Sequence, residues 1–287
     1  MEIRAYAKIN LLLAVGEKRE DGYHEVESLM QSISLFDQMA FACTNSGKIE
    51  LQCNRPYVPR DARNLAVRAA LAFYAHTGIS CSGLHITLRK NIPVGAGLGG
   101  GSSDAAATLR ALNMLHGAKL TACELESIAS GIGADVAFCI RGGAMLARGI
   151  GERLTPAPAL PNVPILLVKP SFPVPTPKAY AAFDAYAAQP VPDTGAMLNA
   201  LKSRSVRKIC ACLGNSLEAP VCALYPQILD IKNALIENGA QGALMSGAGS
   251  TVFAFFRSFS AARQAAKHLP KQFGQRFLCT PQPGDQI

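Results

Sequence analysis

Residues 93–104 read PVGAGLGGGSSD and hold five glycines within seven consecutive positions. With so few side chains in the way, a ligand can approach the main chain closely, and amide N–H groups can converge on an anion. The segment before the loop, residues 84–88, alternates apolar with polar as a half-buried strand does. After the loop, Leu109, Leu112 and Leu115 recur at helical spacing. A strand, a glycine loop and a helix N-terminus in this order predict a site for a phosphate chain.

Two other nucleotide motifs fit this loop poorly. A Walker A loop needs Lys directly before its final Ser or Thr, and here Ser102, Ser103 and Asp104 follow Gly101 without a lysine. The Rossmann fingerprint is formally present, but the strand before it alternates instead of running apolar, and no second strand precedes an acidic residue at the expected distance. A turn that binds nothing is the remaining alternative, although five glycines exceed what a turn requires.

The loop and three further segments resemble the GHMP kinase superfamily, which includes galactokinase, homoserine kinase and mevalonate kinase. The segments are AYAKINL at residues 5–11, DGYHE at 21–25, GAGLGGGSSDAA at 95–106 and MSGAGSTVF at 245–253. The resemblance implies an α+β, two-domain GHMP kinase fold. Its N-terminal half, residues 1–154, would be similar to ribosomal protein S5 domain 2 and carry the phosphate loop. Its C-terminal half, residues 155–287, would be ferredoxin-like and bind substrate.

The rest of the chain is consistent with two soluble domains. It has 287 residues, 49% of them hydrophobic, with no apolar run of membrane-spanning length, so we expect a cytoplasmic protein without membrane partners. Nine cysteines without a C-x-x-C pair indicate reduced core residues instead of disulfides or a zinc site. Residues 155–164 contain four prolines, which predicts the domain junction. Beyond it we expect a strand at 165–168 and helices at 178–188 and 226–238.

The first segment predicts a strand with one chemically active face. Its odd residues from Ala5 to Leu13 are small or apolar and predict the core face, whereas Lys8 and Asn10 share the other face about 7 Å apart. From the residues alone, a solvated strand face is the favoured interpretation of Lys8. The resemblance instead places Lys8 beside the acceptor hydroxyl, with Asn10 at the substrate.

Asp135 follows a turn of small residues, GIGA at 131–134, and precedes apolar sequence. An N-cap or turn aspartate and a buried catalytic carboxylate are both compatible with this context. The resemblance makes Asp135 the general base that accepts the proton of the substrate hydroxyl, together with Lys8.

The resemblance also assigns ligand contacts. The cytosine ring would lie between Tyr23 and Tyr180 and meet His24, because an aromatic ring and a hydrogen-bonding edge suit an unstacked base. Half-buried aromatics without a ligand are the alternative. The remaining substrate contacts are Thr176, Gly247 and Gly249. The ATP contacts are Pro93, Val94, Gly95, Ala96, Gly97, Leu98, Gly99, Gly100, Gly101, Ser102 and Ser103 in the loop, with Asn64, Leu65 and Lys90 at adenine. For Mg²⁺, Ser103 and Asp104 are equally plausible ligands, and phosphates could hold the ion.

The activity that the resemblance implies is ATP- and Mg²⁺-dependent phosphorylation of a sugar alcohol. The DGYHE segment favours 4-diphosphocytidyl-2-C-methyl-D-erythritol, phosphorylated at its 2-hydroxyl on the methylerythritol phosphate route to isoprenoids. Homoserine or mevalonate would be the substrates of other branches. An RNA-binding protein is a further alternative, permitted by the net charge of +8, but stacking aromatics do not alternate with basic residues here. We therefore expect small-molecule partners, no nucleic acid, and a monomer or weak homodimer.

Overall fold

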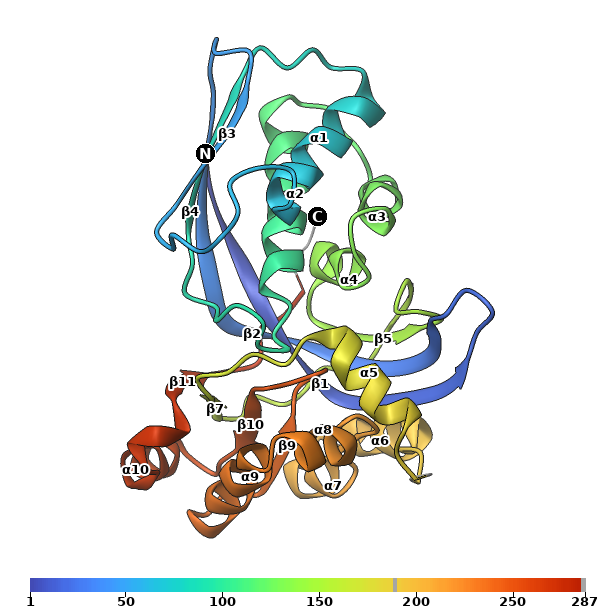
Figure 1. The fold of residues 1–287 in the computed structure, drawn as a ribbon, viewed down its shortest axis with the longest axis vertical. Coiled ribbons are helices and arrows are strands. Elements are labelled where there is room, and N and C mark those ends of the chain that lie inside the picture. The colour runs from blue at the N-terminus through green and yellow to red at the C-terminus, as the bar shows by residue number, and fades with distance from the viewer. Residues whose placement is uncertain (188–189, 285–287) are drawn as a thin grey trace.

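The computed structural model describes residues 1–187 and 190–284. Two sheets divide these residues into an upper and a lower half (Figure 1). The strands of the larger sheet are β1 (Glu2–Lys18), β2 (His24–Cys43), β3 (Ile49–Cys53), β4 (Leu84–Arg89), β5 (Ala144–Arg148), β6 (Arg153–Pro156) and β8 (Gly214–Asn215). The smaller sheet holds β7 (Ile165–Lys169), β9 (Gly242–Met245), β10 (Val252–Phe255) and β11 (Gln275–Cys279).

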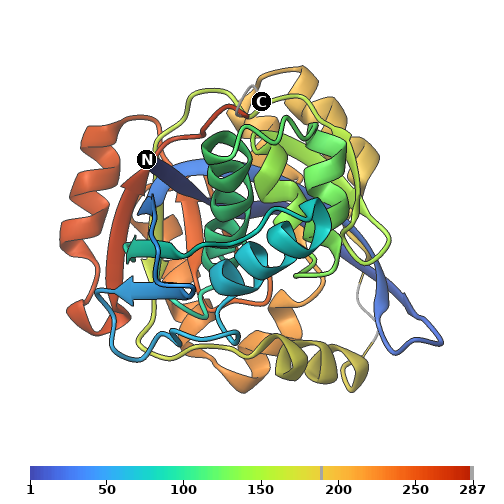
Figure 2. The ribbon, with the colours of Figure 1, turned by 90° about the horizontal axis from the view of Figure 1, so that it is seen from above.

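The larger sheet runs in the order β3, β4, β2, β1, β8, with β5 against β2 and β6 against β5. Four helices lie on one side of it and cross one another as seen from above (Figures 1 and 2). Their shared core is apolar, with Phe73, Leu112 and Phe138 almost fully buried. The helices are α1 (Leu65–Thr77), α2 (Gly100–Leu115), α3 (Ala122–Ser130) and α4 (Val136–Arg141).

The smaller sheet is antiparallel, in the order β11, β7, β10, β9. Alternate residues point to opposite faces of a strand. Leu167 and Phe253 therefore pack with residues of β1, whereas Leu166 and Ala254 pack under the helices below. The small sheet is thus buried on both faces. The lower half contains α5 (Thr176–Asp184), α6 (Thr194–Lys202), α7 (Val206–Ala211), α8 (Glu218–Leu224), α9 (Gln227–Glu237), α10 (Phe259–His268) and the 3₁₀ turn η1 (Lys271–Phe273).

Backbone pairing is one of the ways in which the halves are fastened together. Strand β8 comes from the second half of the sequence but pairs in parallel with β1, at Leu12 and Leu13. Near the C-terminus, Pro281 forms an antiparallel bridge to Ile33 of β2. The larger sheet itself extends through β6 to Pro156, so the division at residues 154 and 155 stays a prediction.

The elements expected around the phosphate loop are confirmed, since β4 precedes the loop and α2 begins within it. The helix expected from Lys178 begins earlier, at Thr176, because Pro177 is favourable in the first turn of a helix. It ends at Asp184, and the expected end at 188 lies outside the described residues. The prediction that the cysteines are core residues was wrong for Cys43 and Cys123, which are exposed. No helix in the described parts of the chain is long and apolar enough to cross a membrane.

Candidate active site

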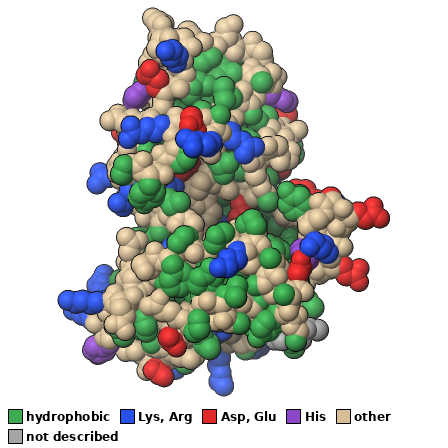
Figure 3. All heavy atoms as spheres, viewed as in Figure 1, with side chains coloured by type: hydrophobic (Ala, Val, Ile, Leu, Met, Phe, Trp, Pro, Cys, Tyr) green, Lys and Arg blue, Asp and Glu red, His purple; other side chains and the backbone are tan. Residues whose placement is uncertain are grey.

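A cleft of about 650 Å³ opens between the two halves, and the surface is hollowed there (Figure 3). Both glycine-rich segments, strand β1 and the start of α5 contribute to its walls. Of the predicted site residues, the cleft is lined by Lys8, Asn10, Asn64, Leu65, Lys90, all residues of 93–102, Asp135, Thr176, Tyr180, Gly247 and Gly249. Tyr23, His24 and Ser103 do not line it.

The phosphate loop presents the open end of α2 to this cleft. Gly99 is the N-cap, with φ of +68°, a conformation that glycine adopts without strain. It has no side chain to cap the helix, so the first amide groups of α2 point out of the helix end. The loop is tied to β1 by the Lys8 N–H, which donates to the Leu98 carbonyl at 3.0 Å. The geometry gives an anion a set of N–H donors and the positive end of a 16-residue helix.

Lys8 and Asp135 meet directly beside that loop. The Lys8 Nζ lies 3.2 Å from Asp135 Oδ2 and donates to Asn10 Oδ1 at 2.7 Å. The Lys8 side chain is 5% exposed, so the solvated strand face is ruled out as its environment. Asp135 stands at the N-cap position of α4, yet its side chain makes no capping hydrogen bond. It is 34% exposed and faces the cleft, so a ligand bound there can contact its carboxylate.

A buried ion triad lies behind the loop. Lys90 Nζ donates to Asp104 Oδ2 at 2.7 Å and also contacts Asp37, whose other oxygen accepts from the Ile92 N–H at 2.8 Å. Burial raises the pKa of the Asp104 carboxyl well above its usual value. The triad joins β2, β4 and α2, and Asp37 gave no signal in the sequence because its partners lie more than fifty positions away.

Asp104 of the triad and its neighbour Ser103 are the two predicted ligands of Mg²⁺. Lys90 Nζ pairs with Asp104 Oδ2, and the Ser103 hydroxyl donates to the Tyr6 carbonyl at 2.7 Å. Across the described residues, no three His, Cys, Asp or Glu side chains converge as a metal site would require. Neither candidate ligand is therefore favoured by the structure over the other.

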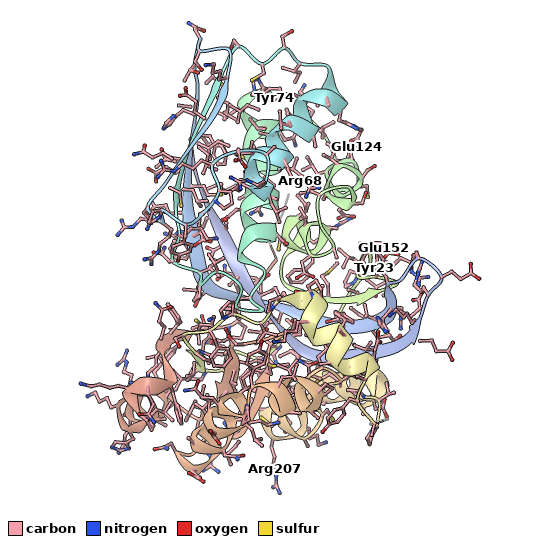
Figure 4. All side chains as sticks on the ribbon, viewed as in Figure 1. Tyr23, Arg68, Tyr74, Glu124, Glu152 and Arg207 are labelled. Carbon is pink, nitrogen blue, oxygen red and sulfur yellow. The ribbon has the colours of Figure 1, made fainter. Side chains whose placement is uncertain are left out.

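An aromatic pair, with Tyr180 in the cleft wall and His24 outside it, stands where a base was predicted. The rings of His24 and Tyr180 stack with centroids 5.3 Å apart, and His24 Nε2 lies 2.7 Å from Asp184 Oδ1. Burial raises the pKa of Tyr180 to about 12, so its hydroxyl stays protonated. Tyr23 is 61% exposed on the projecting hairpin of β1 and β2 (Figure 4). The structure thus brings His24 and Tyr180 together, and it leaves Tyr23 exposed and outside the lining of the cleft.

The second glycine loop closes the cleft from the lower half. Gly247 and Gly249 have φ values of +56° and +88°. The Ser246 hydroxyl donates to the Gly97 carbonyl at 2.9 Å, and a Cβ at Gly97 would lie 2.1 Å from the Ser246 carbonyl oxygen. Close contact between the two loops therefore requires glycine at position 97.

Two of the three predicted adenine residues, Asn64 and Leu65, line the cleft wall at the start of α1, whereas the Lys90 ammonium is paired with Asp37 and Asp104. Asn64 caps α1, because its side chain accepts from the Ala66 N–H at 2.9 Å, and Leu65 is the first residue of that helix. Tyr57 and Arg63 line the same wall and were missed by sequence reasoning, which had no periodic pattern to use in this irregular segment.

Fold and site together define a kinase of small alcohols, and comparisons with known proteins agree. Residues 64–143 match the model of the GHMP kinases N terminal domain, and residues 197–275 match that of the GHMP kinases C terminal domain. The chain belongs to the GHMP kinase family and is an ATP-dependent kinase.

Two relatives that are similar over most of the chain carry the name of one particular kinase. A protein of Clostridium kluyveri named 4-diphosphocytidyl-2-C-methyl-D-erythritol kinase is 41% identical over 278 residues, which cover 97% of this chain and 99% of the relative. The protein of that name from Desulfitobacterium hafniense is 45% identical, covering 93% of this chain and 90% of the relative.

Solved structures of kinases also match this chain. A crystal structure of 4-(cytidine 5'-diphospho)-2C-methyl-D-erythritol kinase matches the full length of both chains with a TM-score of 0.83 and 39% identity. A homoserine kinase of Cytophaga hutchinsonii has a TM-score of 0.75 at 22% identity, covering 98% of this chain and 96% of the other, and shares the fold alone.

Proposed function

We propose that this kinase transfers the γ-phosphoryl group of ATP to the 2-hydroxyl of 4-diphosphocytidyl-2-C-methyl-D-erythritol, on the methylerythritol phosphate route to isoprenoid precursors. One observation carries the proposal: the Lys8 and Asp135 pair stands 3.2 Å apart in a cleft that also contains the open end of α2 and Tyr180. A helix end suited to phosphate, a carboxylate suited to accept a proton and an aromatic surface suited to a base therefore line one cavity. Relatives covering most of the chain carry the name of this activity.

In the proposed reaction, Asp135 accepts the proton of the substrate hydroxyl while Lys8 stabilises the resulting negative charge. Asn10 fixes the Lys8 ammonium through its 2.7 Å contact. The amide groups at the start of α2 offset charge on the transferred phosphoryl group. Phosphoryl transfer passes through a loose transition state, so positioning and charge stabilisation contribute more than nucleophile activation.

Mg²⁺ would neutralise phosphate charge when bound with ATP. The described residues offer no cluster of three acidic, His or Cys ligands. The ion would be held mainly by nucleotide oxygens, and Ser103 or Asp104 would be its protein ligand.

The two ends of the cleft would hold the two bases. Asn64 and Leu65 would contact adenine at the start of α1, and Tyr180 with His24 would contact cytosine. Tyr23 would have to approach the cleft when substrate binds, since it is exposed on its hairpin. The division into a nucleotide-binding half at residues 1–154 and a substrate-binding half at 155–287, a cytoplasmic location and a monomer or weak homodimer complete the proposal.

The test is a coupled assay of ADP release with the cytidine diphosphate alcohol, homoserine and mevalonate as acceptors. We expect turnover with the first alone, and product analysis should find phosphate on its 2-hydroxyl. Preferred turnover of homoserine or mevalonate would refute the substrate assignment while leaving the kinase class intact. Filter binding with mixed RNA at physiological salt should show no retention above background.

A further inference from the structure

Asn215 makes three hydrogen bonds from a buried position behind the second glycine loop. Its Nδ2 donates to the Met245 carbonyl and to the Gly247 carbonyl, both at 2.8 Å, and its Oδ1 accepts from the Leu217 N–H at 2.9 Å. The residue is 9% exposed and belongs to β8, which pairs with β1. Every hydrogen-bonding atom of this side chain is therefore committed, and two of its bonds hold the backbone of the loop.

The bond to Gly247 fixes the direction of the next amide. In a trans peptide the C=O and N–H point to opposite sides. Because the Gly247 carbonyl is held toward Asn215, the N–H of Ala248 points away from it. Ala248 lines the cleft, and Asn215 does not. Within the described part of the chain, this N–H donates to no protein acceptor.

This amide also lies near the catalytic pair. A Cβ at the preceding Gly247 would lie 3.3 Å from Lys8 Nζ and 3.2 Å from Asn10 Oδ1. The loop meets the phosphate loop as well, through the bond from the Ser246 hydroxyl to the Gly97 carbonyl. An unpaired N–H at the junction of phosphate loop and acceptor site is suited to an anionic oxygen.

We infer that Asn215 is a positioning residue that turns the Gly247 peptide so that the Ala248 amide donates to a phosphate oxygen in the cleft. The inference rests on the proposed function for the identity of the substrates. The oxygen belongs either to the phosphoryl group in transfer or to the diphosphate of the alcohol substrate, and both have the same hydrogen-bonding chemistry.

The first test compares Asn215→Asp with the control Ser216→Ala. Aspartate keeps the size and the Oδ1 acceptor, but it replaces the donor with an oxygen that repels both carbonyls. Ser216 belongs to the same junction, where its hydroxyl accepts from the Val15 N–H at 3.2 Å, but it makes no hydrogen bond to the glycine loop. We expect Asn215→Asp to lower kcat/KM by about 10²-fold, the usual effect of losing one oxyanion donor, and Ser216→Ala to match the wild type.

The second test removes the donor without changing Asn215. Replacing Ala248 with L-lactic acid during translation converts its amide N–H to an ester oxygen and should reduce activity to a similar extent. A fall in kcat with unchanged KM values would assign the bond to the transferred phosphoryl group. A rise in KM for the alcohol alone would assign it to the diphosphate.

The outcomes separate a positioning role from a structural one. If Asn215→Asp lowers the melting temperature and the folded enzyme keeps wild-type kcat and KM, the inference is wrong. Wild-type kinetics in the lactic acid variant would overturn it even where Asn215→Asp does not fold. If the wild-type enzyme does not phosphorylate the cytidylyl alcohol, the proposed function is wrong and the inference is untouched. The same variants are then assayed with the alcohol that the enzyme does phosphorylate.

Discussion

The Asp135→Asn substitution tests the catalytic pair most directly. Asparagine keeps the shape of the side chain and can still hydrogen-bond to Lys8, but it cannot accept the substrate proton. Loss of a general base reduces rates by about 10²- to 10⁴-fold, which corresponds to about 3 to 5 kcal/mol in the activation barrier. We expect kcat to fall within that range while the KM for ATP changes little.

The same substitution should hardly affect folding. Lys8 is only 5% exposed, so its ammonium needs a partner, but asparagine still offers it an oxygen and Asn10 Oδ1 accepts from it at 2.7 Å. The loss of stability should therefore be smaller than the expected change in the barrier. A measured melting temperature close to that of the wild type would therefore show that lost activity reflects lost chemistry.

A double substitution sharpens the test. Lys8→Ala should reduce kcat comparably, because the developing alkoxide loses its cation. Residues that act on one proton as a unit are not additive, so the enzyme with both substitutions should be scarcely slower than the poorer single one. Single-turnover measurements would establish that chemistry limits the rate. Near-wild-type single-turnover rates in Asp135→Asn, or losses that multiply in the double variant, would refute the assigned roles.

Four further predictions concern the loop, the base and the ion triad. In Gly99→Val, a β-branched side chain at φ of +68° is strained, and its Cβ would lie 3.0 Å from Lys8 Cγ, so isothermal titration should detect no ATP binding in the folded protein. Tyr23→Ala should raise the KM for the cytidylyl alcohol and leave the KM for ATP unchanged. If the Tyr23 ring stacks on cytosine, the loss in binding free energy should be about 1 to 3 kcal/mol. Equal effects on both substrates would place Tyr23 outside the base site. Lys90→Met should cost about 3 to 5 kcal/mol in urea unfolding, because it strands buried carboxylates, and a stability near wild type would contradict this. Burial raises the pKa of Asp104 above 3.8 in the folded state, so its contribution to stability is complete below that pH and is lost as the pH rises. In Asp104→Asn, the free energy of unfolding should therefore fall less steeply as the pH rises than it does in the wild type. An unchanged dependence of that free energy on pH would argue against the raised pKa.

Local sequence patterns predicted the parts of the site that lie within single elements. The glycine loop between β4 and α2 follows from composition and periodicity, and the shared face of Lys8 and Asn10 follows from the two-residue repeat of a strand. Asp135 could be assigned only by family resemblance, because a turn aspartate and a general base look alike in sequence. Its distance from Lys8 depends on how α4 packs.

Other features depend on contacts between distant segments, which no local pattern encodes. Asp37 reaches Lys90 across 53 positions, and Asn215 reaches Gly247 across 32. The sequence likewise could not show that Tyr180 stacks on His24, since α5 and β2 meet only in the folded chain.

The two-residue strand β8 limits how the halves of this enzyme can move and how its halves can be exchanged with those of a relative. Because Gly214 and Asn215 pair with Leu12 and Leu13 of β1, the halves cannot swing apart as rigid bodies without breaking that pairing. Closure over substrates is then left to loops and to the β1–β2 hairpin. In a chimera that joins the first half of one relative to the second half of another, β1 and β8 come from different parents, so this pairing has to form between strands of two proteins.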